Sequence, residues 1–273
     1  MSSSSEQQPP VSAEKPQTAG AGKKMEQSSL HDQLTDPNLS AFRRYQKLAV
    51  GSDSLWYLIK FELIMLLTSG LSGALGLLLR KHLYPHILGS VGRNVVFGRN
   101  LSIRHGLKIR IGDGTVVDDN ATLDAKGESN KGIDIGPDCI ISKNAILSCK
   151  NADITIGRNS MVGINALVHA VEGSNVTIGD DALIAAFVYL MATGTYGSEE
   201  LDTPFKKQGV YARGGVHLSD NVWLGSSVQI MDGVSIGRGA IVGSGAVVTR
   251  SVADYEVAGG IPAKTIRSRK ASA

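Results

Sequence analysis

Aromatic side chains are scarce in this sequence of 273 residues. Phe, Trp and Tyr together make up 5% of it, whereas glycine accounts for 32 residues. Aromatic residues dominate the buried area of many conventional cores. Their scarcity therefore argues against an ordinary sandwich and favours a fold with thin, repeated layers of aliphatic side chains. The length suits one large domain or two small ones, and the 42% of hydrophobic residues allows a substantial core.

The sequence also contains few cysteines and has a small net charge. Two cysteines, Cys139 and Cys149, cannot form a disulfide framework, so a reducing compartment such as the cytoplasm is the default expectation. Both fall at repeat positions described below, where we expect small buried side chains. The formal net charge of +3 is too small to indicate a nucleic-acid partner.

Large apolar residues are nearly absent from residues 1–40. This stretch opens with MSSSSEQQPPVSAEKPQTAG and is rich in Ser, Gln, Pro, Ala and Gly. Such a segment cannot bury enough surface to offset its chain entropy, so we predict a disordered tail. No apolar run follows a basic start, which excludes a secretory signal in this stretch.

Residues 41–90 contain the most apolar segment, but no long uncharged run. Lys60 and Glu62 interrupt its first part, and the uncharged stretch 63–79 has the minimum length for crossing a bilayer. We predict two short helices with a break near Ser69. Three interpretations stay open: a helical hairpin on a membrane surface, with its basic flank at Arg80; packing against the end of the main domain or a sister subunit; and a transmembrane span. The first would place the protein at the inner face of a membrane.

A six-residue repeat runs through residues 91–266. Every sixth residue is apolar and commonly precedes glycine or another small residue. The resulting 21 hexads form seven groups of three, which begin at Val91, Phe97, Ile103, Ile111, Val117, Leu123, Ile135, Ile141, Leu147, Ile156, Val162, Val168, Ile178, Ile184, Leu190, Leu218, Leu224, Ile230, Ile236, Val242 and Val248. A strand alternates with period two and a helix with period 3.6, so neither explains this pattern.

Period six predicts a triangular coil. Six residues make one flat face, with inward side chains at the first and fifth positions; three faces close a turn, and stacked turns form parallel sheets. We expect the glycine after the first position to turn the corner in a conformation costly for other residues. Short insertions such as 127–132 should bulge at corners. The long insertion 192–215 is large enough to suggest a functional loop.

The sequence from Leu218 onward resembles the C-terminal half of the hexapeptide acetyltransferases. The matching phrases are VWLG, GVSIGRGAIVGSGAVVT and VAGGIPAK. This family includes the galactoside, maltose, xenobiotic and polysaccharide O-acetyltransferases. The resemblance implies a left-handed parallel β-helix, here of about seven coils over residues 91–266, with a basic tail at 267–273. It also implies a homotrimer, for which outward apolar residues such as Phe187, Tyr189 and Val247 would supply contacts.

The resemblance further implies that acetyl-CoA or another acyl-CoA lies along the outside of the coil. Trp223 and Ser226 would line the pantetheine end. The remaining expected contacts are small or hydroxyl-bearing residues along the pantetheine arm and cations at the CoA phosphates, namely Ser244, Gly245, Thr249, Arg250, Lys264 and Arg267. Cationic side chains suit phosphate oxygens, and small residues admit a thin ligand. No metal is implied.

The catalytic step departs from the family pattern. Its members use a histidine in the long loop as general base, which is worth roughly 10² to 10⁴ in rate. The loop here reads YLMATGTYGSEELDTPFKKQG, and counting back from Pro204 places Thr195 at the position of the base. A threonine hydroxyl cannot accept a proton near neutral pH.

Several other residues could replace the missing base. His169 points outward on a coil next to the loop, and imidazole titrates in a suitable range, so we predict it as the substitute. The alternatives are His217, Glu199, Glu200 and Asp202. Asn165 matches an acceptor-binding asparagine of the sugar acetyltransferases.

Two functions therefore compete. One is an acyl-CoA-dependent O-acyltransferase acting on a sugar, polysaccharide or lipid-linked hydroxyl. The other is a catalytically silent coil, a scaffold or acyl-CoA-binding protein, as Thr195 would suggest. A zinc enzyme on the same coil would need three histidines at one site, and no closely spaced pair is present. The first ninety residues lack the glycine-rich turn of a nucleotide-binding domain.

Overall fold

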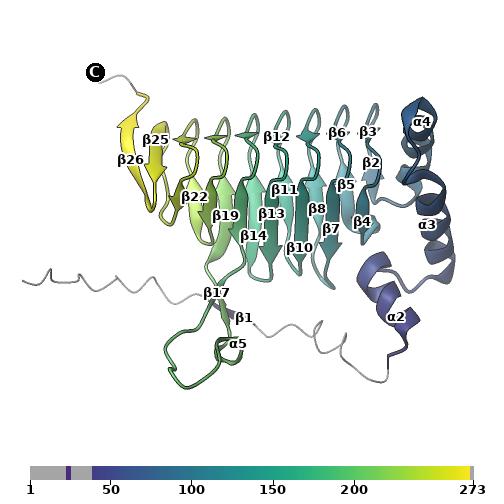
Figure 1. The fold of residues 1–273 in the computed structure, drawn as a ribbon, viewed down its shortest axis with the longest axis horizontal. Coiled ribbons are helices and arrows are strands. Elements are labelled where there is room, and N and C mark those ends of the chain that lie inside the picture. Colours follow the sequence, from purple (N-terminus) through teal and green to yellow (C-terminus); the bar gives the residue numbers. More distant parts are fainter. Residues whose placement is uncertain (1–22, 26–38, 271–273) are drawn as a thin grey trace, which may run out of the picture.

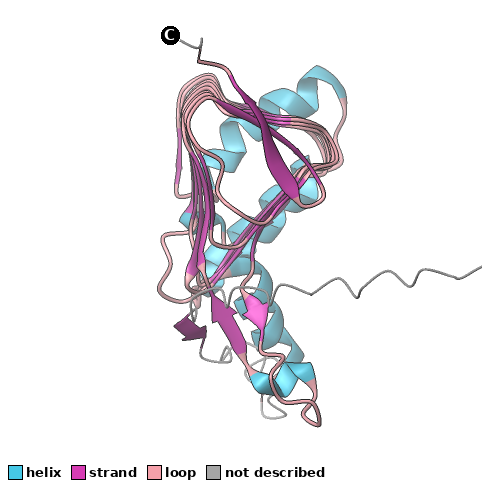
Figure 2. Cartoon of the chain, turned by 90° about the vertical axis from the view of Figure 1, so that its left-hand side faces the viewer, coloured by secondary structure: helices cyan, strands magenta, loops and turns pink. Residues whose placement is uncertain are grey.

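The computed structural model describes residues 23–25 and 39–270. Most of these residues form a parallel β-solenoid of about seven turns, and a helical segment lies at its N-terminal end (Figure 1). Viewed down the axis, the coil has a triangular section (Figure 2). The predicted coil is therefore confirmed, and its turns follow the predicted groups of three hexads.

Each turn contributes one strand to each of three faces. The first face contains β2 (Ser90–Val91), β5 (Ile109–Ile111), β8 (Ile133–Ile135), β11 (Ile154–Ile156), β14 (Ser174–Ile178), β19 (Gly214–Leu218) and β22 (Val234–Ile236). The second face contains β3 (Val96–Phe97), β6 (Val116–Val117), β9 (Ile140–Ile141), β12 (Met161–Val162), β15 (Leu183–Ile184), β20 (Trp223–Leu224), β23 (Ile241–Val242), β25 (Glu256–Gly260) and the antiparallel β26 (Ala263–Ser268). The third face contains β4 (Ser102–Arg104), β7 (Thr122–Lys126), β10 (Ile146–Lys150), β13 (Leu167–Val171), β16 (Tyr189–Ala192), β21 (Gln229–Met231) and β24 (Val247–Val248).

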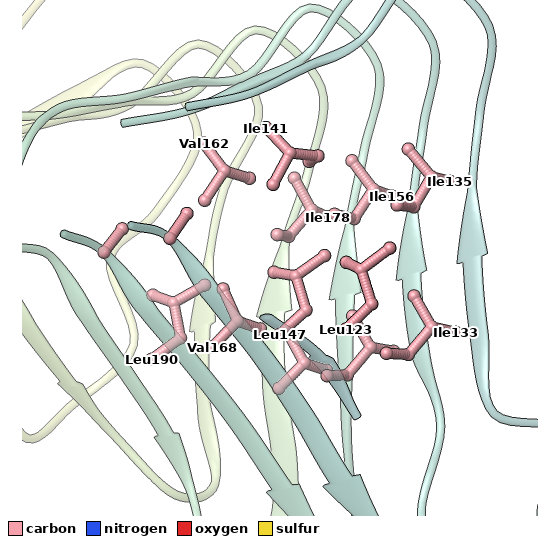
Figure 3. Packing of buried hydrophobic residues seen from close by; sticks show 14 of the residues in the cluster. Leu123, Ile133, Ile135, Ile141, Leu147, Ile156, Val162, Val168, Ile178 and Leu190 are labelled. Carbon is pink, nitrogen blue, oxygen red and sulfur yellow. The ribbon is translucent and has the colours of Figure 1, made fainter. Parts of the chain in front are cut away.

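Like side chains stack on like inside the coil. Of the 21 predicted inward residues that open a hexad, 20 are buried and Val91 is half-buried. Figure 3 shows columns of equivalent residues such as Ile135, Ile156 and Ile178. The two cysteines are buried as expected. Burial raises the pKa of the Cys149 thiol to about 12, which makes it a small apolar side chain in practice.

The corners correct the predicted role of glycine. Glycine in the second position is needed for close approach between coils, because a Cβ on Gly112 would lie 2.5 Å from the nitrogen of Pro137 in the next coil. The left-handed backbone conformation falls two residues later. Between the first and second faces it occurs at Asn94, Gly114, Asp138, Asn159, Asp181, Asn221, Gly239 and Tyr255. Asn, Asp and Gly tolerate this conformation best.

The N-terminal helical segment, residues 41–86, caps the first coil. It consists of α2 (Ala41–Tyr45), a π turn (Gln46–Val50), α3 (Leu55–Thr68), α4 (Gly73–Leu83) and a 3₁₀ turn (Tyr84–His86). The predicted break near Ser69 is confirmed, and one side of α3 joins the core of the coil. Among the described residues, no helix has the length and apolarity to cross a membrane.

Arg80 holds this cap together from inside. Its guanidinium donates to the carbonyl oxygen of Thr68 at 3.0 Å, to that of Leu71 at 2.7 Å and to that of Phe97 at 2.9 Å. These carbonyls belong to the end of α3, the turn that follows it and the first coil. The expectation that Arg80 forms part of an exposed basic flank was therefore wrong, because only 4% of the residue is accessible.

Both predicted tails are partly ordered. Residues 23–25 form β1 (Lys23–Met25) instead of disordered chain, and pair antiparallel with β18 (Val210–Ala212). Most of the predicted tail 1–40 lies outside the described residues. At the other end, the predicted basic tail begins inside β26, because Arg267 pairs with Val257.

Candidate active site

The long loop leaves the coil after β16 and returns at β19. It contains β17 (Thr195–Tyr196), α5 (Phe205–Gln208) and β18, so the predicted excursion 192–215 is a small folded element (Figure 2). β18 is the centre of a three-stranded sheet with β17 and β1. The Gln208 amide closes the tip by donating to the carbonyl oxygens of Glu200 and Thr203 at 2.8 and 2.7 Å.

A buried carboxylate fixes the return of this loop. Asp232, on the turn after β21, accepts hydrogen bonds from the backbone N–H of Arg213 at 2.7 Å and of Gly215 at 2.8 Å. It also accepts from the hydroxyl of Ser174 at 2.9 Å. The sequence analysis did not predict Asp232. A usable signal was present, because Asp232 is an acidic residue in the first coil that follows the long insertion. Three hydrogen bonds to one buried charge give the loop a fixed root.

The loop residues expected near the chemistry are solvent-exposed. Thr195 pairs with Tyr211 across the β17–β18 ribbon, and its side chain is exposed. Glu199, Glu200 and Asp202 are exposed near the tip of the loop. None of the three carboxylates therefore lies in the enclosed setting in which a general base is usually held.

His169 lies in the middle of the third face, one strand before the loop leaves. Its neighbours in register are Ser148 on β10 and Met191 on β16. The imidazole is half-buried, and burial, helped by the nearby Lys126 ammonium, lowers its pKa below the usual 6.5. The ring is therefore neutral at pH 7 and able to accept a proton.

A partly buried ion pair lies two strands before His169 on the same face. Asp124, in register with Ser148, is 5% exposed, and its Oδ2 is 2.9 Å from Lys126 Nζ. The Asp124 charge opposes the lowering of the His169 pKa, but it is outweighed. Asp124 and His169 both stand one residue after a hexad opener on the third face, so register could have predicted this neighbourhood.

His217 and Asn165 lie elsewhere. His217 is exposed on the first face, where its Nε2 is 3.2 Å from the carbonyl oxygen of Gly214, so the coil does not bring it together with His169. Asn165 occupies a left-handed corner between the second and third faces and accepts a hydrogen bond from Asn144 Nδ2 at 3.0 Å. That corner conformation accounts for an asparagine at position 165.

Four of the residues expected to contact acyl-CoA line up along one corner. Ser226, Ser244, Gly245 and Lys264, here called the C-terminal corner, are all exposed where the second face meets the third. The Gly245 N–H donates to the Ser226 carbonyl oxygen at 2.8 Å, which places consecutive coils in register. Lys264 continues the line because it pairs with Gly259 on β25.

The other four expected contacts are spread out. Thr249 and Arg250 follow β24 at the far edge of the third face, and Arg267 lies three residues beyond Lys264 on β26. The predicted cations therefore do not form one cluster within a single chain. Trp223 is 49% exposed on the second face, between Leu183 and Ile241 in register.

An exposed apolar strip crosses the second and third faces. On most strands, the residue before each hexad opener points outward, and in the central coils it is large and apolar. Its exposed members on the strands are Ile140, Ile146, Met161, Leu183, Tyr189 and Trp223, and Ile164 and Phe187 join them at the corner between the two faces. A strip of this kind on a β-solenoid is typical of a protein interface. The described residues contain no group of three His, Cys, Asp or Glu side chains able to hold a metal ion.

Two family models match the coil. Residues 215–250 match the bacterial transferase hexapeptide (six repeats), and residues 153–192 match the hexapeptide repeat of succinyl-transferase. These two segments are therefore similar to the hexapeptide repeats of bacterial transferases. The first match contains most of the C-terminal corner, and the second contains His169 and Asn165. None of the curated proteins compared with this chain matches it.

Solved structures of acetyltransferases and acyltransferases resemble the chain at low identity. The polySia-specific acetyltransferase NeuO is 24% identical over 67% of this chain and 85% of its own, with a TM-score of 0.42. AntD, an N-acyltransferase from Bacillus cereus in complex with dTDP and 3-hydroxybutyryl-CoA, is 23% identical over 67% and 84%, with a TM-score of 0.47. The hexapeptide-repeat acetyltransferase VCA0836 from Vibrio cholerae is 21% identical over 80% and 95%, with a TM-score of 0.38. At these values the substrates remain properties of those proteins.

Proposed function

We propose that this protein is an acyl-CoA-dependent O-acyltransferase whose acceptor is a hydroxyl of a sugar, polysaccharide or lipid-linked glycan. The observation that carries the proposal is the C-terminal corner. Its exposed small residues Ser226, Ser244 and Gly245 lie inside the segment that matches the transferase hexapeptide model. Lys264 follows that segment and forms the end of the corner. Small residues let a thin pantetheine arm approach the backbone, and the ammonium suits a phosphate. Acetyl is the acyl group proposed.

His169 is the proposed general base. It lies three coils before Ser244 along the axis, roughly 14 Å at about 4.8 Å per coil. An extended pantetheine arm lying along the coil can cover that distance. The neutral imidazole takes the proton of the acceptor hydroxyl as its oxygen attacks the thioester carbonyl carbon. The carbon–sulfur bond then breaks, and the leaving CoA thiolate takes up that proton.

The active assembly is proposed to be a homotrimer. The exposed apolar strip supports this, because burying it against a second copy would remove eight large apolar side chains from water. Such packing would also bring the long loop of one copy toward the coil of the next. The two buried thiols suit a reducing compartment, and we extend the proposal to a cytoplasmic location.

The competing proposal is a catalytically silent acyl-CoA-binding coil. The observation in its favour is Thr195, which stands exposed on β17 where a base would be expected. Binding of acetyl-CoA without release of CoA in the presence of any hydroxyl acceptor would favour it.

Turnover of acetyl-CoA separates the two proposals. Purified protein is incubated with acetyl-CoA and a panel of sugar and polysaccharide acceptors, and free thiol release is followed. The transferase proposal expects acceptor-dependent release that His169→Ala reduces roughly 10²- to 10⁴-fold while acetyl-CoA affinity stays unchanged. His217→Ala is the matched control, because that imidazole lies on another face, and it should keep full activity. Equal activity of His169→Ala and wild type would eliminate His169 as the base.

A further inference from the structure

Helix α3 carries large apolar residues on both its inner and its outer side, with Lys60 and Glu62 as its two charged residues, yet only the inner side has a partner in the described chain. Its inner side, with Tyr57, Leu58, Phe61 and Ile64, is buried against the end of the coil. A helix that is hydrophobic all round is normally enclosed by a larger core or by lipid. The outer side of α3 therefore lacks the environment that its composition suits.

The unpartnered surface extends over α3 and α4, which lie side by side at the end of the coil (Figure 1). Its two most exposed members are Leu66, at 83%, and Trp56, at 75%. We call the outer cap surface the set Leu55, Trp56, Ile59, Leu63, Leu66, Leu67, Leu71, Leu75, Leu77 and Leu78. An apolar patch of this size on a soluble domain marks a binding surface.

The charges around this surface are mostly positive. Residues 39–88 contain six Lys and Arg side chains and two Asp and Glu side chains. Arg80 is buried, whereas Lys81 at the end of α4 is exposed. Glu62, the single acidic residue on α3, accepts a hydrogen bond from the Tyr45 hydroxyl. An apolar surface with a cationic border complements an anionic lipid headgroup layer.

We infer that the outer cap surface binds the surface of an anionic phospholipid bilayer. The helices lie in the headgroup region with their leucines toward the acyl chains, and Trp56 sits at the boundary that indoles prefer. Neither helix crosses the bilayer, in keeping with their length. Because the cap closes one end of the coil, all three side faces and the long loop remain accessible when the cap is bound (Figure 1).

Membrane binding would favour lipid-linked acceptors over free sugars. This statement about the acceptor rests on the proposed function. A coil that is fixed to a bilayer by one end can reach only acceptors that lie within one coil length of the headgroups. Lipid-linked glycans are concentrated in that layer, whereas free sugars are not. In the proposed trimer with parallel coils, the three caps would face the same plane and bind the bilayer together.

Vesicle binding tests the inference directly. The full chain is mixed with vesicles of phosphatidylcholine alone or of phosphatidylcholine with phosphatidylglycerol, and bound protein is measured by flotation. The chain contains two tryptophans, so Trp223→Phe leaves Trp56 as the only indole. We expect binding to the anionic vesicles, weaker binding to the neutral ones, and a blue shift of Trp56 fluorescence on binding.

Matched variants locate the binding surface. Leu66→Ser combined with Leu75→Ser should weaken partition to anionic vesicles at least tenfold, because two exposed leucines no longer enter the acyl region. Ile266→Ser removes a similarly exposed apolar side chain, 68% accessible, at the other end of the coil and should leave partition unchanged. Lys81→Gln should weaken binding to the anionic vesicles more than to the neutral ones.

Two results would overturn the inference. The first is no partition to either vesicle, or partition that the double variant does not change. The second is an assembly that the double variant dissociates in sedimentation without any effect on lipid, which would make the surface a contact between copies. Acetyl-CoA affinity is measured on the same samples, so failure of the wild-type chain to bind lipid while it still binds CoA refutes this inference and not the proposed function.

Discussion

His169 shows how a coil can tune one side chain for chemistry. Its position on a flat strand gives it neighbours above and below at fixed spacing, and burial among them lowers its pKa. Thr195 has no such environment, because the ribbon that carries it projects into solvent. The sequence could predict that position 195 in the loop lacks a general base. Register could place Asp124 two strands before His169 on the same face, but it could not predict that Asp124 is buried against Lys126.

His105 predicts a pH dependence of stability. It is 8% exposed, and its Nε2 donates to the Lys47 carbonyl oxygen at 2.8 Å. Burial lowers its pKa in the folded state below the usual 6.5, so the unfolded chain binds a proton first as pH falls. The free energy of unfolding should therefore drop as pH falls below about 6.5. Urea unfolding of wild type and His105→Gln at several pH values checks this. An identical pH slope in both proteins would contradict it.

At the scale of elements, the six-residue period predicted the strands β2–β16 and β19–β24 of the coil, because each hexad repeats the same inward positions; β25 and β26 follow the last hexad and were not predicted. The long loop has no period, so its three-stranded sheet with β1 could not be predicted. Helix α3 has apolar residues on both sides, so its composition could not predict which side faces protein. Its inner side packs against the coil, as one of the predicted alternatives has it. Its outer side is the one for which membrane contact is proposed.

The Asp232 anchor predicts the stability of the loop root. Asp232→Ala leaves the N–H groups of Arg213 and Gly215 without their acceptor, which should cost about 2–4 kcal/mol in local stability. Tryptic cleavage after Arg213 requires local opening, so its rate should rise at least tenfold. Asp254→Ala is the control, because that exposed carboxylate caps only Arg238 N–H. Unchanged cleavage after Arg213 in Asp232→Ala would show that other contacts hold the root.

At the scale of the whole molecule, the coil is a rod with a distinct surface at each position along its length. One end carries the outer cap surface, the middle carries the apolar strip and His169, and the other end carries the C-terminal corner. The period predicts the rod itself. The cations predicted to meet the CoA phosphates nevertheless separate across faces, because Arg250 and Lys264 lie on different edges once three strands close each turn.

The apolar strip predicts the oligomeric state. Leu183 is 43% exposed and lies between Met161 and Trp223 in register. Leu183→Glu would place a charge inside the proposed trimer contact and should convert trimers to monomers at micromolar concentration. Sedimentation velocity measures this. Leu201→Glu, at a loop-tip position that is 95% exposed, is the control and should remain trimeric. A wild-type monomer would contradict the trimer.

Calorimetric titration of the purified protein with acetyl-CoA tests the central claim most directly. Lys264→Ala removes the cation that ends the C-terminal corner, whereas Arg93→Ala removes an exposed cation at the other end of the coil. The account predicts micromolar binding that Lys264→Ala weakens about tenfold, as expected for loss of a charge-assisted contact to phosphate, and that Arg93→Ala leaves unchanged. Absence of heat at high acetyl-CoA concentration, or equal affinity of both variants and wild type, would contradict acyl-CoA binding at this corner.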